Sequence, residues 1–266
     1  MRKVCLFASI VLLVGGLADR TGWAQVGRGP VIDLSYPFSA ETIFWPTEER
    51  GFVLENIHRG YTEQGYYYTA NRFCTAEHGG THLDAPIHFY EGRWTADVIP
   101  LDRLIGPGVV VDVSDRCAAD RDYRVQVEDF RRWEKRHGRI PTGAIVLIRT
   151  GFGRYWPDRR QYLGTDRRGP EAVAELHFPG LHPEAARWLI ERRRIRAVGI
   201  DTASIDHGPS TKFESHVVLA EHNVPIFENV ANLDRLPPRG FTVIALPMKI
   251  EGGSGGPLRI IALLGR

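Results

Sequence analysis

Hydrophobic and polar positions along the chain form blocks that predict strands alternating with helices. Residues 109–113, VVVDV, are a β-branched run with one aspartate, bounded by glycine and serine, which is typical of a buried strand. Residues 127–137 predict a helix that ends at Gly138, and Pro183 stands in the favoured first turn of another helix with an apolar stripe. Further strands are expected at 31–36, 144–149, 197–200, 225–227, 241–246 and 259–264, and a short helix at 215–222.

This order of elements predicts an α/β fold with a mixed sheet, because strands alternating with helices are the pattern of that class. The chain has 266 residues and 43% hydrophobic content, which is enough for one sizeable core. We therefore expect residues 25–266 to form a single domain. Residues 151–179 have the least regular pattern and are predicted to form a long loop or a lid.

Residues 1–24 differ from the rest of the chain and predict a secretory signal peptide. Arg2 and Lys3 give a positive start, residues 4–18 are apolar, and Gly22 and Ala24 place small residues before a cleavage point. The apolar run is short for a membrane span of about twenty residues, and a pair of glycines interrupts it. The mature protein is therefore expected to be exported, periplasmic or secreted, with no membrane attachment.

Cleavage would also change the charge and the cysteine content. The formal charge of +2 falls to zero when the basic leader is removed. The arginine-rich stretches that remain alternate with acidic and aromatic residues, so they predict solvated helix faces and no nucleic-acid partner. Cys74 and Cys117 also remain. An exported pair can form a disulfide, and the spacing leaves a disulfide and two free thiols equally open.

The segment EHGGTHLDAPIHF, residues 77–89, concentrates side chains that bind metals. Its glycines, threonine and proline disfavour a helix. In an extended chain, period two places His78, His82 and Asp84 on one side, and a glycine leaves room between them. Imidazole and carboxylate suit zinc or manganese, and three ligands with an open position are typical of a catalytic site. A polar surface loop is the alternative, but this combination favours a metal.

Two further features point to the same site. Pro86 turns the chain and aims His88 at the metal from another direction. Glu228 follows an apolar pair in a predicted strand, where a carboxylate is unfavourable unless it is paired or coordinates a metal. His216 begins the preceding helix. This pair would complete or double the metal site, although Glu228 alone would fit an arginine partner equally well.

Ser254 lies in GGSGG, which fits the Gly-x-Ser-x-Gly sequence of a nucleophile elbow. That serine-hydrolase site needs an acid and a histidine later in the chain, and no Asp, Glu or His follows Ser254. The segment is instead expected to bring the backbone close to a ligand or to form a turn between strands. The remaining histidines are predicted to be surface or structural residues: His58, His137, His177, His182, His207 and His222.

The pattern His-x-Gly-Thr-His-x-Asp-x-Pro-x-His of residues 78–88 resembles the signature of the cyclase family of metal-dependent hydrolases, which includes bacterial kynurenine formamidases and isatin hydrolases. Similar segments follow along most of the mature chain: DLSYPF and FWP, FPGLHPEAARWL, VGIDTASID, the spacing of His216 and Glu228, and MKIEGGSGGPLRIIA. The resemblance implies a swivelling β/β/α fold with a mixed central sheet, in a homodimer or a larger homo-oligomer.

The resemblance also implies roles for individual residues. One or two divalent metals, zinc or manganese, would be held by His78, His82, Asp84, His216 and Glu228. Asp84 would bridge the two metals, His88 would be the catalytic acid and base, and Trp45 would line the substrate pocket.

The leading hypothesis is therefore metal-dependent hydrolysis of an amide in a small-molecule substrate. An arylformamidase would convert N-formyl-L-kynurenine, or a related aryl formamide, into the amine and formate. Two alternatives stay open. The same site would open a cyclic amide or a lactone, as in isatin hydrolases, or the chain would be an exported metal-binding or ligand-binding protein without catalysis.

Overall fold

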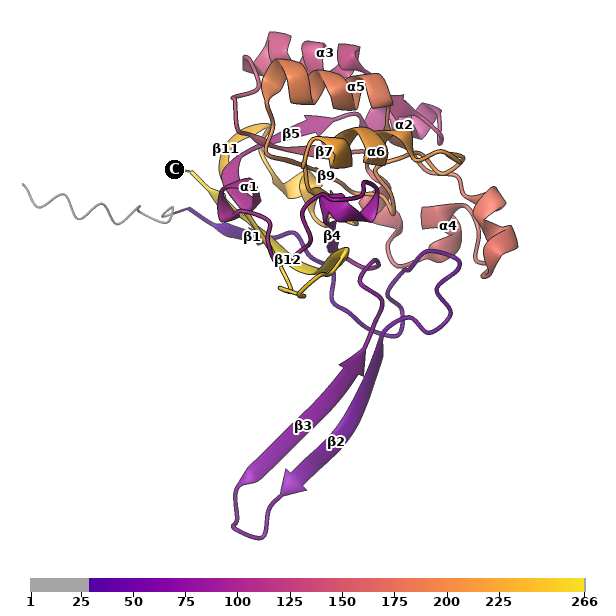
Figure 1. Cartoon of the computed structure of the whole chain (residues 1–266), viewed down its shortest axis with the longest axis vertical. Coiled ribbons are helices and arrows are strands. Elements are labelled where there is room, and N and C mark those ends of the chain that lie inside the picture. The colour runs from indigo at the N-terminus through magenta and orange to yellow at the C-terminus, as the bar shows by residue number, and fades with distance from the viewer. Residues whose placement is uncertain (1–28, 266) are drawn as a thin grey trace, which may run out of the picture.

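A ring of β-strands forms the centre of the computed structural model, which describes residues 29–265 (Figure 1). Its strands are β4 His82–Asp84, β5 Ile105–Asp112, β7 Ile145–Arg149, β9 Ala197–Ile200, β10 Ile226–Glu228, β11 Arg239–Pro247 and β12 Gly255–Leu264. They follow the order β12-β11-β5-β7-β9-β10-β4, and β4 pairs with β12 to close the ring. The strand β1, Val31–Asp33, pairs with the later part of β12.

The ring mixes parallel and antiparallel pairs, as the sequence predicts. β5, β7, β9 and β10 run parallel to one another, and β4, β11 and β12 join them in antiparallel pairs. β1 is shorter than the predicted strand over 31–36, because the Ser35 amide donates to the Asp33 side chain and leaves the ladder. The predicted signal peptide, residues 1–24, lies outside the described residues.

Helices cover the outer face of the parallel strands. The α-helices are α1 Leu101–Leu104, α2 Ser114–Ala119, α3 Val127–His137, α4 Arg159–Leu163, α5 Pro183–Trp188 and α6 Glu214–Glu221. Short 3₁₀ turns are η1 Pro86–His88, η2 Phe152–Tyr155, η3 Pro170–Glu175 and η5 Leu233–Arg235, and η4, Leu189–Arg193, is a π-helical continuation of α5. α3 and α5 lie side by side over the strands (Figure 1). The helix predicted to end at Gly138 does end there.

Alternate side chains of the central strands pack into two different cores. On β7, Val146 and Ile148 pack on the helix side, whereas Ile145 and Leu147 pack inside the ring. All four side chains are fully buried. Both faces of the strand are therefore apolar, which is why its sequence is a continuous hydrophobic run without alternation.

Leu147→Ala is expected to lower the free energy of unfolding by about 2–5 kcal/mol, because the change leaves a cavity inside the closed ring. Urea unfolding followed by circular dichroism measures this loss. The matched control is Leu101→Ala at an exposed position of α1, which should change stability by less than about 0.5 kcal/mol. Equal unfolding midpoints for the two variants would contradict the described core.

Residues 151–179, predicted to form a long loop or a lid, form an irregular segment that packs on the body. The segment forms η2, α4 and η3, and its side chains Phe152, Tyr162 and Phe178 are buried in the helix-side core. The Tyr162 hydroxyl donates to Asn229 Oδ1 at 2.9 Å. Buried aromatic side chains hold the irregular backbone of this segment in place.

A hairpin that the sequence pattern does not predict projects from the body on the side away from α3 and α5 (Figure 1). Its strands are β2, Val53–Tyr61, and β3, Tyr67–Cys74. Nearly all of their side chains are exposed. In the described part of the chain these two strands pair only with each other, and a small third sheet joins β6, Arg124–Val125, to β8, Gly180–Leu181.

The structure also decides the question of the two cysteines. Cys74 is exposed at the end of β3, Cys117 is buried in α2, and both are free thiols, so they do not form the disulfide that their export would permit. Across residues 29–265, none of the helices combines the length and the apolar character needed to cross a membrane.

Candidate metal centre

Two neighbouring strands place three of the predicted ligands on one face. β4 carries His82 and Asp84, and Glu228 at the end of β10 lies directly opposite His82 in the antiparallel ladder. Successive side chains of a strand point to opposite faces. Leu83 therefore packs inside the ring, while its two polar neighbours face the helix side. His82, Asp84 and Glu228 are each less than 5% exposed.

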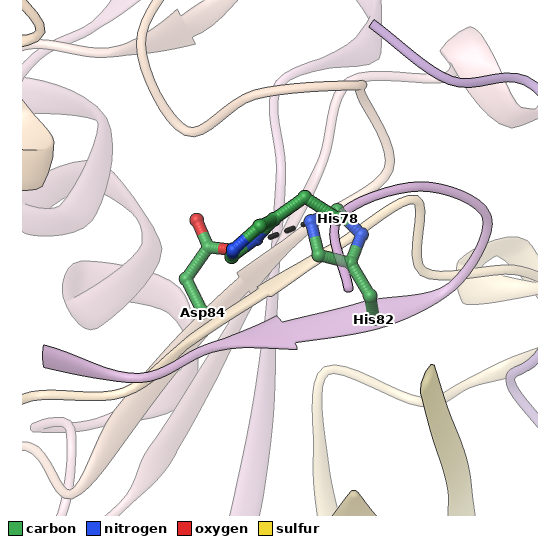
Figure 2. A group of neighbouring side chains, drawn as sticks. All are labelled: His78, His82 and Asp84. Carbon is green, nitrogen blue, oxygen red and sulfur yellow. Dashed lines mark hydrogen bonds and ion pairs between the residues drawn. The ribbon is translucent and has the colours of Figure 1, made fainter. Parts of the chain in front are cut away.

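His78 reaches the same place by a different route from the one predicted. The backbone is not extended from 78 to 84, because strand pairing begins only at His82 and Gly79 and Gly80 form a bend. Gly80 has φ +56, and a Cβ on Gly79 would lie 2.0 Å from the Phe44 ring. Both positions therefore require glycine. The bend still places His78 Nδ1 2.7 Å from Asp84 Oδ1. Figure 2 shows the side chains of His78, His82 and Asp84 as neighbours.

The other oxygen of the Asp84 carboxylate, Oδ2, lies next to a second group of predicted ligands. His216, in the first turn of α6, places Nε2 3.2 Å from Asp84 Oδ2 and 3.1 Å from Glu228 Oε1. His82 Nε2 lies 3.1 Å from Asp84 Oδ1. Two sets of donor atoms result, His78/His82/Asp84 and Asp84/His216/Glu228, and the atoms of each set lie within 4.8 Å of one another. The structure thus brings all five predicted ligands together, with Asp84 common to both sets.

The hydrogen bonds on the outer side of two imidazoles define which nitrogen faces the cluster. His82 Nδ1 lies 2.9 Å from the Gly80 carbonyl oxygen, and His216 Nδ1 lies 2.7 Å from Asp206 Oδ2. These oxygens only accept, so each Nδ1 donates its hydrogen. In the neutral ring, Nε2 then carries a lone pair that points at carboxylate oxygens. Such an arrangement is favourable only when a proton or a metal ion lies between the nitrogen and the oxygen.

The pKa values of His82 and Glu228 also indicate that the cluster favours positive charge. Burial lowers the pKa of His82, but the hydrogen bond and charge of Asp84 outweigh it and raise the pKa to about 9. Burial, together with the charge of Asp84, raises the pKa of the Glu228 carboxyl. Two buried carboxylates and inward-facing imidazole nitrogens thus form a mixed nitrogen and oxygen donor set. The residues fit a divalent metal.

His88 lies next to the cluster and belongs to neither donor set. The turn η1 begins at Pro86 and ends at His88, as predicted, and the His88 ring stacks on His78 with centroids 3.8 Å apart. Burial of the ring against its neighbours lowers the pKa of His88 to about 4. The imidazole is therefore neutral at neutral pH and has a free lone pair to accept a proton.

An apolar cavity of about 240 Å³ opens over the cluster. Its walls include Trp45, Phe44, Phe89 and Phe213, and its polar floor is the donor cluster with His88. Trp45 packs against Phe213 with ring centroids 6.2 Å apart. The predicted pocket residue therefore does line the cavity, whose shape and aromatic walls suit a flat apolar ring above the donors.

Three residues that support the cluster are not among the predicted site residues. Asp206 stands next to His207, and its carboxylate holds His216 and accepts from two backbone amides of α6. Asn229 follows Glu228 and donates to the Gly80 carbonyl oxygen at 2.7 Å. Ser254 lies 2.9 Å from His78 Nε2. Adjacency to the predicted ligand Glu228 is the sequence signal for Asn229, whereas no predicted ligand is adjacent to Asp206. Ser254 lies in the glycine segment that is expected to approach a ligand or to form a turn.

Comparison with known proteins agrees with this geometry. The sequence profile of the Cyclase family, described as "Putative cyclase", matches residues 32–207. The chain belongs to this family. The cyclase-family relative isatin hydrolase of Roseibium aggregatum is 34% identical over 243 residues, 88% of this chain and 87% of the relative. Kynurenine formamidase of Salinibacter ruber is 28% identical over 231 residues, 87% of this chain and 96% of the relative.

The fold is shared with solved structures of the Cyclase family. Isatin hydrolase A from Ralstonia solanacearum superposes with a TM-score of 0.77 at 35% sequence identity, covering 88% of this chain and 92% of that one. The family predicted from residues 78–88 is thus confirmed, and so is the mixed α/β fold.

Asp206→Asn is expected to weaken metal binding at the Asp84/His216/Glu228 set by about 10–100-fold, because His216 loses the carboxylate that orients it. Asparagine keeps one acceptor oxygen for the amides of α6, so the helix should remain. Glu214→Gln, an exposed change in the same helix, is the control. Isothermal titration with Mn²⁺ measures both, and equal affinities would contradict the orienting role of Asp206.

Proposed function

We propose that the protein is a metal-dependent hydrolase that cleaves the C–N bond of an amide attached to an aromatic ring. The observation that carries the proposal is the five-residue donor cluster, buried at four residues and half-buried at His78. Two carboxylates and three imidazoles form it at the floor of an aromatic cavity. Hydrolase relatives in the same family support it.

The protein's own residues supply most of the required steps. When bound, a divalent metal lowers the pKa of water and polarises a carbonyl oxygen. The aromatic walls, Trp45 among them, hold the substrate ring and exclude bulk water. His88 accepts a proton from the attacking water, since its ring is neutral at neutral pH. It then returns that proton to the leaving nitrogen.

The ring amide is the first candidate substrate and the aryl formamide the second. Isatin hydrolase of Roseibium aggregatum has 34% identity to the chain, against 28% for kynurenine formamidase of Salinibacter ruber. Both chemistries need the same attack on a carbonyl carbon and the same protonation of an aryl nitrogen. They differ in the product: a cyclic amide opens to one molecule, whereas a formamide releases formate.

A substrate panel tests the proposal. Protein loaded with Mn²⁺ or Zn²⁺ is incubated with isatin, N-formyl-L-kynurenine and an aryl lactone, and substrate loss and formate are measured in parallel. Loss of isatin without formate supports the ring amide, and formate release supports the formamide. Protein that is replete with metal and inert on the whole panel would contradict catalysis and favour a binding protein.

The chain is also proposed to form a homodimer or a larger homo-oligomer through the hairpin β2–β3. Leu54 and Ile57 are both 60% exposed on it, and an isolated two-stranded hairpin is only marginally stable in water. Both of its edges lack a strand partner within residues 29–265. A second copy would cover these edges and apolar side chains.

Leu54→Glu combined with Ile57→Glu is expected to convert the oligomer to a monomer, because charged side chains cannot be buried unpaired in the interface. Sedimentation equilibrium measures the mass. The control is Leu101→Glu with Met248→Glu, two exposed positions on the body. A double hairpin variant with the same mass as the wild type would contradict the proposed interface.

Export is proposed from the leader at residues 1–24. A basic start, an apolar run and small residues before Ala24 support cleavage there. N-terminal sequencing of protein recovered outside the cytoplasm should begin at Gln25. Full-length protein confined to the cytoplasm would contradict export and would leave the hydrolase proposal unaffected.

A further inference from the structure

The GGSGG segment, which does not form a nucleophile elbow, contacts the ligand residue His78 on the side away from Asp84. Ser254 lies just before β12, and its hydroxyl is 2.9 Å from His78 Nε2 and 2.5 Å from Glu77 Oε2. The Ser254 amide also donates to Glu77 Oε2 at 3.1 Å. On the opposite side of the imidazole, His78 Nδ1 faces Asp84. The His78 ring therefore lies between Asp84 on one side and the Ser254–Glu77 pair on the other.

The glycines on both sides of the serine are explained by this contact. A Cβ at Gly253 would lie 2.7 Å from Glu77 Oε1, and a Cβ at Gly255 would lie 2.6 Å from His78 Cε1. Either side chain would force the partner away. Gly255 also pairs with Asp84 in the β12–β4 ladder, so the serine is fixed to the strand that carries two of the ligands. Close packing around Glu77 and His78 therefore accounts for the two glycines that directly flank Ser254.

The chemistry of the three groups fixes the direction of both hydrogen bonds. A carboxylate only accepts, so Glu77 takes the hydroxyl hydrogen of Ser254. The serine oxygen then has only lone pairs left for His78, and Nε2 must donate its hydrogen to them. In the neutral ring, Nδ1 is consequently the bare nitrogen, and it is the one that faces Asp84.

We propose that Glu77 and Ser254 are positioning residues that fix His78 in the tautomer with a bare Nδ1, so that His78 binds the metal through Nδ1. His82 and His216 present the opposite nitrogen, Nε2, because their Nδ1 atoms donate to oxygens. This inference rests on the proposed metal-dependent function, since it assigns the role of two residues toward the metal of the His78/His82/Asp84 set.

Removal of the serine hydroxyl tests the proposal. In a Glu228→Gln background, which leaves the His78/His82/Asp84 set intact, Ser254→Ala is expected to weaken Zn²⁺ binding by about 10–100-fold. Ser254→Thr, which retains a hydroxyl, should restore much of the affinity, and Glu77→Gln should weaken it. Glu251→Gln, an exposed change in the same turn, is the matched control and should bind like the background. Competition with a chromophoric chelator measures each affinity.

A second measurement needs no variant. Long-range ¹H–¹⁵N spectra of the zinc-loaded wild type report which ring nitrogen of each histidine carries hydrogen. His78 should be protonated at Nε2, whereas His82 and His216 should be protonated at Nδ1. A His78 protonated at Nδ1, or a Ser254→Ala affinity within twofold of the background, would overturn the inference. Zinc-binding wild type that hydrolyses nothing would overturn the proposed function and leave these two readouts intact.

Discussion

Replacing Asp84 with asparagine is expected to remove metal from both donor sets and to abolish hydrolysis with it. Asp84 is the one residue shared by the two sets. Burial opposes its ionisation, but positive charge on the neighbouring imidazoles, His78 first, outweighs burial and holds the pKa of Asp84 well below its usual range. Asparagine has the same shape and no charge, so the packing of β4 is retained while the central anion is lost.

Metal content per chain measures this effect most directly. Loss of a residue that only orients a ligand already weakens binding by about 10–100-fold, so loss of a shared ligand should exceed a hundredfold. The matched variant is Glu228→Gln, which removes an equal charge from only one set and should leave the other able to bind. Metal content in Asp84→Asn equal to that of Glu228→Gln would contradict the shared role, provided that circular dichroism shows both variants folded.

The central sheet is predictable because burial leaves a signal in the sequence. β5 and β7 are covered on both faces, so they appear as continuous apolar runs, and the helix α3 ends where Gly138 adopts φ +83. The hairpin gives no such signal. Its side chains face no core, so neither period two nor a hydrophobic run marks it, and residues such as Glu55 and Arg59 lie among its tyrosines.

The ligands are predictable for a related reason, whereas their supports are not. His78, His82 and Asp84 lie within seven consecutive residues, and the fixed spacing of His216 and Glu228 reflects the short connection from α6 to β10. Ser254 is separated from His78 by 176 positions. Its contact exists only after β12 pairs with β4, and that pairing depends on the closure of the whole ring.

The bend at Gly79 and Gly80 shows the limit of periodicity. Period two predicts the correct convergence of His78 with Asp84 through an incorrect, extended backbone. The actual conformation depends on Phe44, which occupies the space where a side chain on Gly79 would lie. A contact with a residue 35 positions away could not be inferred from the spacing of the histidines.

Replacing His88 with alanine is expected to reduce kcat by about 10²–10⁴-fold while the metal content stays at the wild-type level. His88 is absent from both donor sets and stacks on His78 from the cavity side. Its low pKa keeps the ring neutral at neutral pH, so a ring nitrogen retains its lone pair. Loss of the imidazole therefore removes proton transfer at the reacting nitrogen but leaves the ligands and the aromatic walls in place.

Measurement of both kcat and metal content distinguishes the possible roles of His88. A histidine that served as a ligand would lower both quantities together, whereas one that served only to pack on His78 would be replaced adequately by a flat side chain. His88→Phe should therefore be as slow as His88→Ala, and His137→Ala, a histidine in the last turn of α3, should be unchanged. Loss of metal from His88→Ala would make His88 a ligand. Recovery of kcat in His88→Phe would make it a packing residue, and either result would remove its assignment as the acid and base.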